Sequence, residues 1–85
     1  MSRPRVTAKN QLDYIIRYES GELNGEEQLA LFGYLIRTGQ AWSLQGHYGR
    51  TASQMIEHGL INKKGEVQWQ VYERAVADIG MAMSG

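Results

Sequence analysis

Hydrophobic residues recur at helical spacing in four segments of the chain, and polar stretches that contain glycine separate these segments. In the first segment, residues 8–19, the apolar side chains fall on one side of a helix. Thr7 is a good N-cap residue for this helix, and Gly21 can adopt the left-handed conformation that ends it. The apolar positions are Leu12, Ile15 and Ile16, with Tyr14 and Tyr18 on a neighbouring face.

The second segment predicts a central helix that ends at Gly39. Asn24 is its N-cap candidate, and Glu26 and Glu27 lie in the first turn, where the helix dipole favours negative charge. Its apolar side is broad, which is typical of a helix with neighbours on several sides. These apolar residues are Leu29, Leu31, Phe32, Tyr34, Leu35 and Ile36.

Residues 40–45 predict a single helical turn or a tight connection, with Trp42 and Leu44 as buried anchors. The glycines of GHYG, residues 46–49, then favour a break in the chain, and a third helix is expected over Thr51–His58. Residues 60–68 fit either a minimal β-hairpin or a plain loop. A last helix is expected from Glu66 to about Met81, with apolar positions Val71, Tyr72, Ala75, Val76 and Ile79.

The chain is therefore expected to be all-α, a small bundle of about four helices with a short central helical turn and at most a minimal β-ribbon. With 85 residues it forms one domain, because a second core could not be built from the remainder. We expect a flexible arm over residues 1–6, the helical domain over 7–82 and a disordered tail over 83–85.

Composition excludes several classes of protein. Nine basic and nine acidic residues cancel, so no whole-chain field attracts nucleic acid or membrane. The absence of cysteine excludes disulfides, thiolate metal sites and cysteine nucleophiles. No stretch has the length and apolar character of a signal peptide or a membrane span, which predicts an intracellular, soluble protein. Two histidines 11 positions apart do not indicate a zinc site, and we expect no metal and no cofactor.

The stretch LQGHYGR, residues 44–50, combines polar groups with two glycines. His47 as a general base and Arg50 as an anion stabiliser would suit catalysis, but no carboxylate is adjacent. Backbone amides at Gly46 and Gly49 would suit a phosphate, yet the spacing matches neither the Walker pattern nor GxGxxG. We favour an architectural corner between two helices, with exposed polar groups.

Residues 18–61 resemble a family of small uncharacterised proteins of tailed bacteriophages. The resemblance is carried by YESGEL at 18–23, TG at 38–39, AW at 41–42, LQG at 44–46, YGR at 48–50 and the closing GLI at 59–61. It implies a phage gene product that acts in the cytoplasm of an infected bacterium, and it implies no reaction.

The leading hypothesis is a non-enzymatic binding module that engages a host or phage protein, with a role in host takeover or against host defence. Tyrosine, tryptophan and arginine are enriched at interface hot spots, and this chain has more aromatic residues than so small a core can bury. A homodimer would use the same residues. The proposed contact residues are Trp42, Gln45, His47, Tyr48 and Arg50, flanked by Tyr14 and Tyr18.

The alternative is a nucleic-acid-binding protein of winged-helix type. A recognition helix at 50–58 would offer polar side chains to a groove, and lysines on the wing would meet phosphate. The zero net charge argues against it. Its contact residues would be Arg3, Arg5, Lys9, Arg50, Gln54, Lys63 and Lys64. An enzyme is not expected, because paired carboxylates, a metal cluster and triad spacing are all missing.

Overall fold

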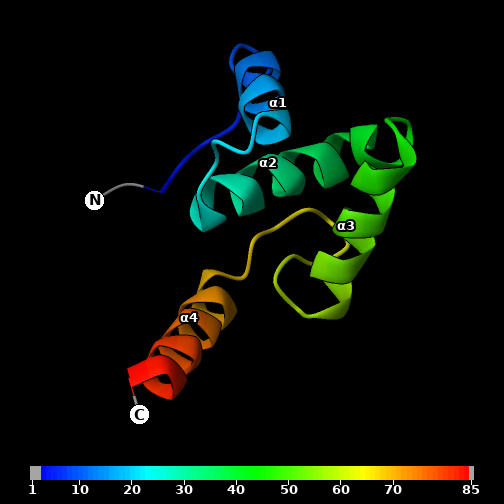
Figure 1. Cartoon of the computed structure of the whole chain (residues 1–85). Coiled ribbons are helices and arrows are strands. Elements are labelled where there is room, and N and C mark those ends of the chain that lie inside the picture. Colours follow the sequence, from blue (N-terminus) through cyan, green and yellow to red (C-terminus); the bar gives the residue numbers. More distant parts are fainter. Residues whose placement is uncertain (1–2, 85) are drawn as a thin grey trace.

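The computed structural model describes the backbone of residues 3–84 and the side chains of residues 3–77, and over this range the chain is all-α (Figure 1). The elements are α1 (Gln11–Glu19), α2 (Gly25–Thr38), the 3-10 turn η1 (Gln40–Trp42), α3 (Gly46–Glu57) and α4 (Trp69–Ser84). Residues 60–68 contain an isolated antiparallel bridge between Ile61 and Val67. The described residues therefore hold no strand, and the expected all-α class is confirmed.

α2 is the central helix because both of its ends are fixed by local sequence. At the start, the Asn24 side chain accepts a hydrogen bond from the Glu27 amide (2.8 Å), and the Glu27 carboxylate accepts one from the Asn24 amide (3.0 Å). This capping box satisfies two amides that have no partner within the helix. At the other end Gly39 has φ +81°, the left-handed conformation that ends a helix. Both ends lie where the sequence predicted them.

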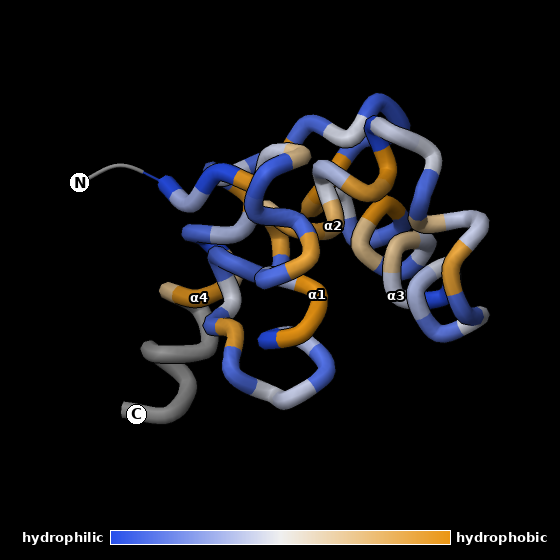
Figure 2. The backbone as a smooth tube through the Cα atoms, turned by 90° about the horizontal axis from the view of Figure 1, so that it is seen from above, coloured by the Kyte–Doolittle hydropathy of each residue, from blue (hydrophilic) through white to orange (hydrophobic). Residues whose placement is uncertain are grey.

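The core is built on α2, with α1 and α3 packed around it and the 60–68 segment beneath it (Figure 1). Phe32, Leu31 and Leu35 are fully buried. In Figure 2 hydrophobic positions occur on each of the labelled helices, interspersed with polar ones. The other buried hydrophobic residues are Val6, Leu23, Leu29, Ala30, Ile36, Ala41, Tyr48, Ala52 and Ile61.

The segment after α3 returns to α2 through a tight turn at Asn62–Gly65. The Asn62 side chain accepts hydrogen bonds from the amides of Lys64 (3.0 Å) and Glu66 (2.9 Å). Gly65 lies directly against α2, because a Cβ placed at Gly33 would come 2.9 Å from the Gly65 carbonyl oxygen. The two glycines let the backbones of the turn and the helix touch.

α4 leaves the body of the molecule after its first turn, and this gives the protein its elongated outline of 41 × 23 × 23 Å (Figure 1). Trp69 and Tyr72 pack against the core cluster. Val71 (39% exposed) and Val76 (49% exposed) do not. Among the side chains of α4 that the structure describes, residues 69–77, those that pack on the core therefore belong to its first turn.

Three helix starts differ from the sequence prediction. α1 begins at Gln11 rather than Ala8 because Asn10 closes a turn, with its side chain accepting from the Thr7 amide (2.7 Å) and donating to the Arg5 carbonyl (3.0 Å). α4 begins at Trp69 rather than Glu66, since Val67 is occupied by the bridge to Ile61. α3 begins at Gly46, so the GHYG residues expected to break the chain form its first turn.

The predicted burial of Trp42 and Leu44 is also wrong. Trp42 is 53% exposed and Leu44 is 37% exposed. η1 is only three residues long, and the residue of η1 that is buried is Ala41 rather than Trp42. The domain boundaries remain predictions: within the arm expected at 1–6, Val6 is buried, and Gly85 of the expected tail lies outside the described residues.

The capping box makes stability depend on pH. The hydrogen bond from the Asn24 amide, followed by that from Arg17, holds the pKa of Glu27 below its ordinary value of 4.5. A group with a lowered pKa stabilises the fold above its unfolded-state pKa, and this contribution is lost as pH falls through the folded-state value. We expect the free energy of unfolding to decrease below about pH 4.5, and Glu27→Gln to make this decrease shallower. Urea titrations between pH 6 and 3 measure both slopes, and equal slopes would contradict the assignment.

Candidate interaction surface

An aromatic cluster joins the first turn of α3 to α1 and α2. The ring of Tyr48 lies 6.0 Å from that of Phe32, 5.6 Å from that of Tyr18 and 4.2 Å from that of His47, measured between centroids. Tyr18 in turn packs edge-on against Phe32 at 5.3 Å. The cluster fixes where the LQGHYGR residues sit relative to α1.

Tyr48 is the buried member of this cluster, with 2% of its surface exposed. Its hydroxyl donates a hydrogen bond to the Glu19 carboxylate at 2.7 Å. Burial, and then the neighbouring carboxylate, raise the pKa of the Tyr48 phenol, so the hydroxyl keeps its proton and remains a donor. Tyr48 therefore acts as a core residue with a polar tip, and its ring is not available to a partner.

The other contact residues predicted from sequence lie in different environments. Trp42, Gln45 and Arg50 are exposed. His47 and Tyr18 are half-buried at the rim of the aromatic cluster, where their rings stack at 6.5 Å. Tyr14 is half-buried too, and the guanidinium of Arg17 lies over its ring, 5.5 Å from the ring centroid.

Sequence reasoning missed two apolar residues on the outer side of α1. Leu12 is 67% exposed and Ile16 is 55% exposed, although helical spacing predicted both to be buried. They share a helical stripe with Glu19, whose carboxylate binds Tyr48 on α3. Leu12 and Ile16 therefore lie on the same exposed side of α1 as Glu19. One feature of the sequence could have indicated this exposure: the apolar surface predicted for α1 is wider than one neighbouring helix can cover.

α1 and η1 are also joined directly, since the side-chain amides of Gln11 and Gln40 exchange hydrogen bonds of 3.3 and 3.2 Å. This contact places the first residue of α1, which precedes Leu12 in the sequence, next to η1, which carries Trp42. We call the four exposed side chains of this region, Leu12, Ile16, Trp42 and Leu44, the α1–η1 face. Large exposed apolar residues on neighbouring elements are characteristic of interaction sites.

Arg50 extends the α1–η1 face with a positive charge. Its guanidinium folds back over the first turn of α3, and a Cβ placed at Gly46 would come 3.1 Å from Arg50 Nη1. Gly49 lies against η1, where an added Cβ would come 3.7 Å from the Trp42 ring. A side chain at Gly46 would therefore meet the end of the Arg50 side chain, and one at Gly49 would contact the Trp42 ring.

The residues of the nucleic-acid alternative are scattered over several elements. Arg3 is engaged by Glu26 and Glu73. Lys63 and Lys64 are exposed in the turn that connects the two residues of the Ile61–Val67 bridge, and this bridge is all that the described residues show of a wing. The remaining candidates, Arg5, Lys9, Arg50 and Gln54, are exposed.

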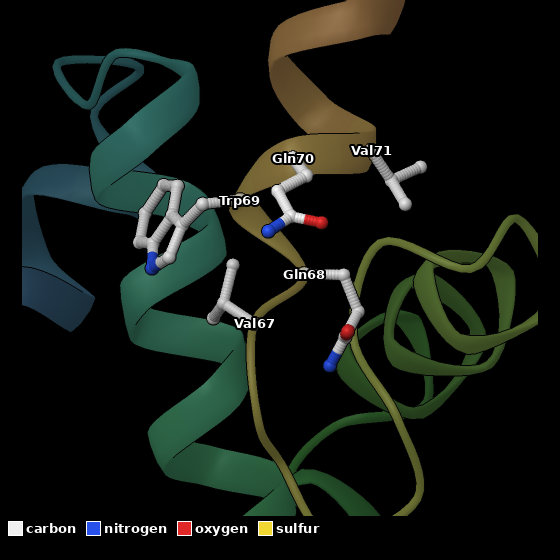
Figure 3. Close-up of a pocket in the computed structure, with 5 residues that line it drawn as sticks. All are labelled: Val67, Gln68, Trp69, Gln70 and Val71. Carbon is white, nitrogen blue, oxygen red and sulfur yellow. The ribbon is translucent and has the colours of Figure 1, made fainter.

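One shallow pocket lies where the chain enters α4 (Figure 3). It measures about 240 Å³ and is lined by Val67, Gln68, Trp69, Gln70 and Val71. In Figure 3 Val67 and Trp69 point toward α2, whereas Gln68 and Val71 point to the other side. Small-molecule sites usually measure about 300 Å³ or more and draw on several elements. This pocket is a concavity at the bend of the chain.

The described residues form neither a metal-binding cluster nor a membrane span. Among the side chains of residues 3–77, three or more histidine, aspartate or glutamate groups do not gather in a metal-binding arrangement. Within the described backbone, residues 3–84, every helix is too short or too polar to cross a membrane. The expectations of no enzyme, no metal and no cofactor remain predictions.

Comparison with known proteins identifies a family but no function. Residues 6–79 match the model of a family described as a domain of unknown function (DUF7417), and the chain belongs to this family. No curated protein and no solved structure matches the chain. The family match covers the buried Val6, α1, η1 and α3, and so includes the whole α1–η1 face.

Proposed function

We propose that this member of the family is a non-enzymatic binding protein that uses the α1–η1 face to engage another protein. The observation that carries the proposal is the exposure of Trp42, 53%, beside three further apolar side chains on a domain of 85 residues. Tryptophan is among the residues most enriched at interface hot spots, where its large ring fills a pocket of the partner.

The surroundings of the α1–η1 face support a protein partner. The Gln11–Gln40 pair joins α1 to η1, and the aromatic cluster joins α1 to α2 and α3, so the elements beneath the face are already placed before binding, which lowers the entropy cost of ordering them. Arg50 and Gln45 supply polar groups at its edge. The chain as a whole is uncharged, which favours contacts through apolar surface over binding to a polyanion.

The resemblance to small tailed-phage proteins extends the proposal. A phage-encoded protein of this kind would act in the cytoplasm of the infected bacterium on a host or phage complex, as an agent of host takeover or against host defence. Self-association through the same face is compatible with this role, because a second copy also offers an apolar surface.

The test is affinity capture from bacterial lysate, with and without nuclease, using the wild type and two variants. Trp42→Ala removes the centre of the α1–η1 face. Val76→Ala removes a comparably exposed residue (49%) on α4 and serves as the matched control. We expect a stoichiometric, nuclease-resistant partner that Val76→Ala retains and that Trp42→Ala reduces about 30-fold, the effect of losing a hot spot.

Stability decides how this result is interpreted. Because both side chains are largely exposed, the free energy of unfolding of each variant should lie within about 0.5 kcal/mol of the wild-type value. Equal capture by Trp42→Ala and the wild type would contradict the proposal. A partner lost on nuclease treatment would instead support binding to nucleic acid.

A further inference from the structure

Arg3 lies at a junction of three groups that belong to two different helices. Its guanidinium donates to the Glu26 carboxylate at the start of α2 (3.3 Å) and to the Glu73 carboxylate on α4. It also lies over the ring of Trp69, 4.6 Å from the ring centroid. A planar guanidinium suits this junction because it can bridge two carboxylates and stack on an aromatic ring at once.

The arm that carries Arg3 is held in place from the other side. Val6, three residues along, is 5% exposed in the core, and the Arg5 carbonyl accepts a hydrogen bond from the Asn10 side chain. Three residues span at most about 10 Å, so the burial of Val6 restricts Arg3 to the region around the start of α2. In Figure 1 the blue segment before α1 runs along the side of the molecule where α2 begins and α4 departs.

α4 has few other attachments to the body. Trp69 and Tyr72 of its first turn pack inward, and Tyr72 lies against Gly25, where an added Cβ would come 3.2 Å from Tyr72 Cζ. Beyond that turn, residues 73–77 are exposed. The attachment of α4 thus consists of two aromatic side chains, and Arg3 reaches this turn from the arm.

We propose that Arg3 is a latch that holds α4 against the start of α2 and sets the fraction of molecules in which α4 is docked. When the latch opens, α4 detaches as a unit and uncovers Trp69, Tyr72 and the surface around Gly25. The groups of the latch are solvent-accessible, with the Arg3 side chain 38% exposed and those of Glu26 and Glu73 42% and 58% exposed. Salt or a competing carboxylate can therefore reach them. This device does not depend on the α1–η1 face.

Hydrogen exchange on the full chain tests the latch. Arg3→Ala should raise the exchange rates of α4 amides 72–77 about 5- to 20-fold, the combined effect of two exposed ion pairs and a cation–π contact. Amides 30–36 in α2 should keep their wild-type rates. Arg5→Ala, which removes an exposed arginine two residues away, is the matched control and should change neither set.

A second readout follows Trp69 itself. In a Trp42→Phe background Trp69 is the remaining tryptophan, and Arg3→Ala should make its fluorescence more accessible to acrylamide. Raising the salt concentration to 1 M should have the same effect on the protein with Arg3 and little effect on Arg3→Ala, because salt screens exposed pairs. Unchanged exchange at 72–77 in Arg3→Ala would overturn the proposal. A parallel rise in α2 would also overturn it, since Arg3 would then stabilise the whole fold.

Discussion

Gly65→Ala is expected to destabilise the protein by about 3 kcal/mol or more, because two independent costs add at this position. Gly65 has φ +88°, a conformation that L-residues with a side chain adopt at a cost of about 1 kcal/mol or more. A Cβ would also come 2.7 Å from the Arg37 amide nitrogen and 2.9 Å from Arg37 Cβ. These atoms belong to α2, so relief of the clash requires the turn and the central helix to move apart.

Gly59→Ala isolates the first of the two costs. Gly59 also has positive φ (+76°), but no atom lies within 4 Å of a Cβ placed there. We expect this control to lose about 1 kcal/mol from backbone strain alone. For a domain of this size, 1 kcal/mol corresponds to a shift in Tm of about 4–8 °C, so the two variants should separate clearly in thermal melts. Equal losses would mean that the turn at Gly65 does not press on α2.

The glycines also show where sequence reasoning succeeded and where it failed. Gly21 and Gly39 were expected to end helices, and both have the positive φ that this role requires. Gly46 and Gly49 were expected to break the chain, yet both lie inside α3. The glycine that close packing requires is Gly33, where an added Cβ would come 2.9 Å from the Gly65 carbonyl oxygen, whereas a Cβ at Gly49 would make an ordinary contact, 3.5 Å from the Ala41 carbonyl oxygen. A glycine needed for contact and a glycine needed for a turn look alike in a sequence, because only the tertiary partner distinguishes them.

The same limit applies to the α1–η1 face. Helical spacing correctly placed Ile15 toward the core, and Asn24 fixed the start of α2. Spacing could not show that Leu12 and Ile16 would have no neighbour, since burial depends on which elements pack together and not on the helix itself. Trp42 illustrates the reverse case: it was chosen as a contact residue and also as a buried anchor, and the exposure of its ring rules out the buried anchor, while the contact role remains a prediction.

Tyr48→Ala is expected to cost about 3–5 kcal/mol, as for other large aromatic residues removed from a core. On the sequence alone, Tyr48 was a contact residue whose loss would weaken partner binding. The structure instead places its ring among Phe32, Tyr18 and His47, where truncation leaves a cavity between three helices. For a domain of 85 residues this is a large part of a total stability of about 4–13 kcal/mol.

Tyr48→Phe separates the ring from the hydroxyl. It keeps the packing and removes the hydrogen bond to Glu19, which should cost about 1 kcal/mol, because Glu19 is exposed and water can replace the lost donor. Urea unfolding of the two variants beside the wild type measures both terms. If Tyr48→Ala were as stable as the wild type but no longer bound the partner, Tyr48 would be a contact residue rather than a core residue. A Tyr48→Phe variant as unstable as Tyr48→Ala would make the bond to Glu19, rather than the aromatic cluster, the main link between α1 and α3.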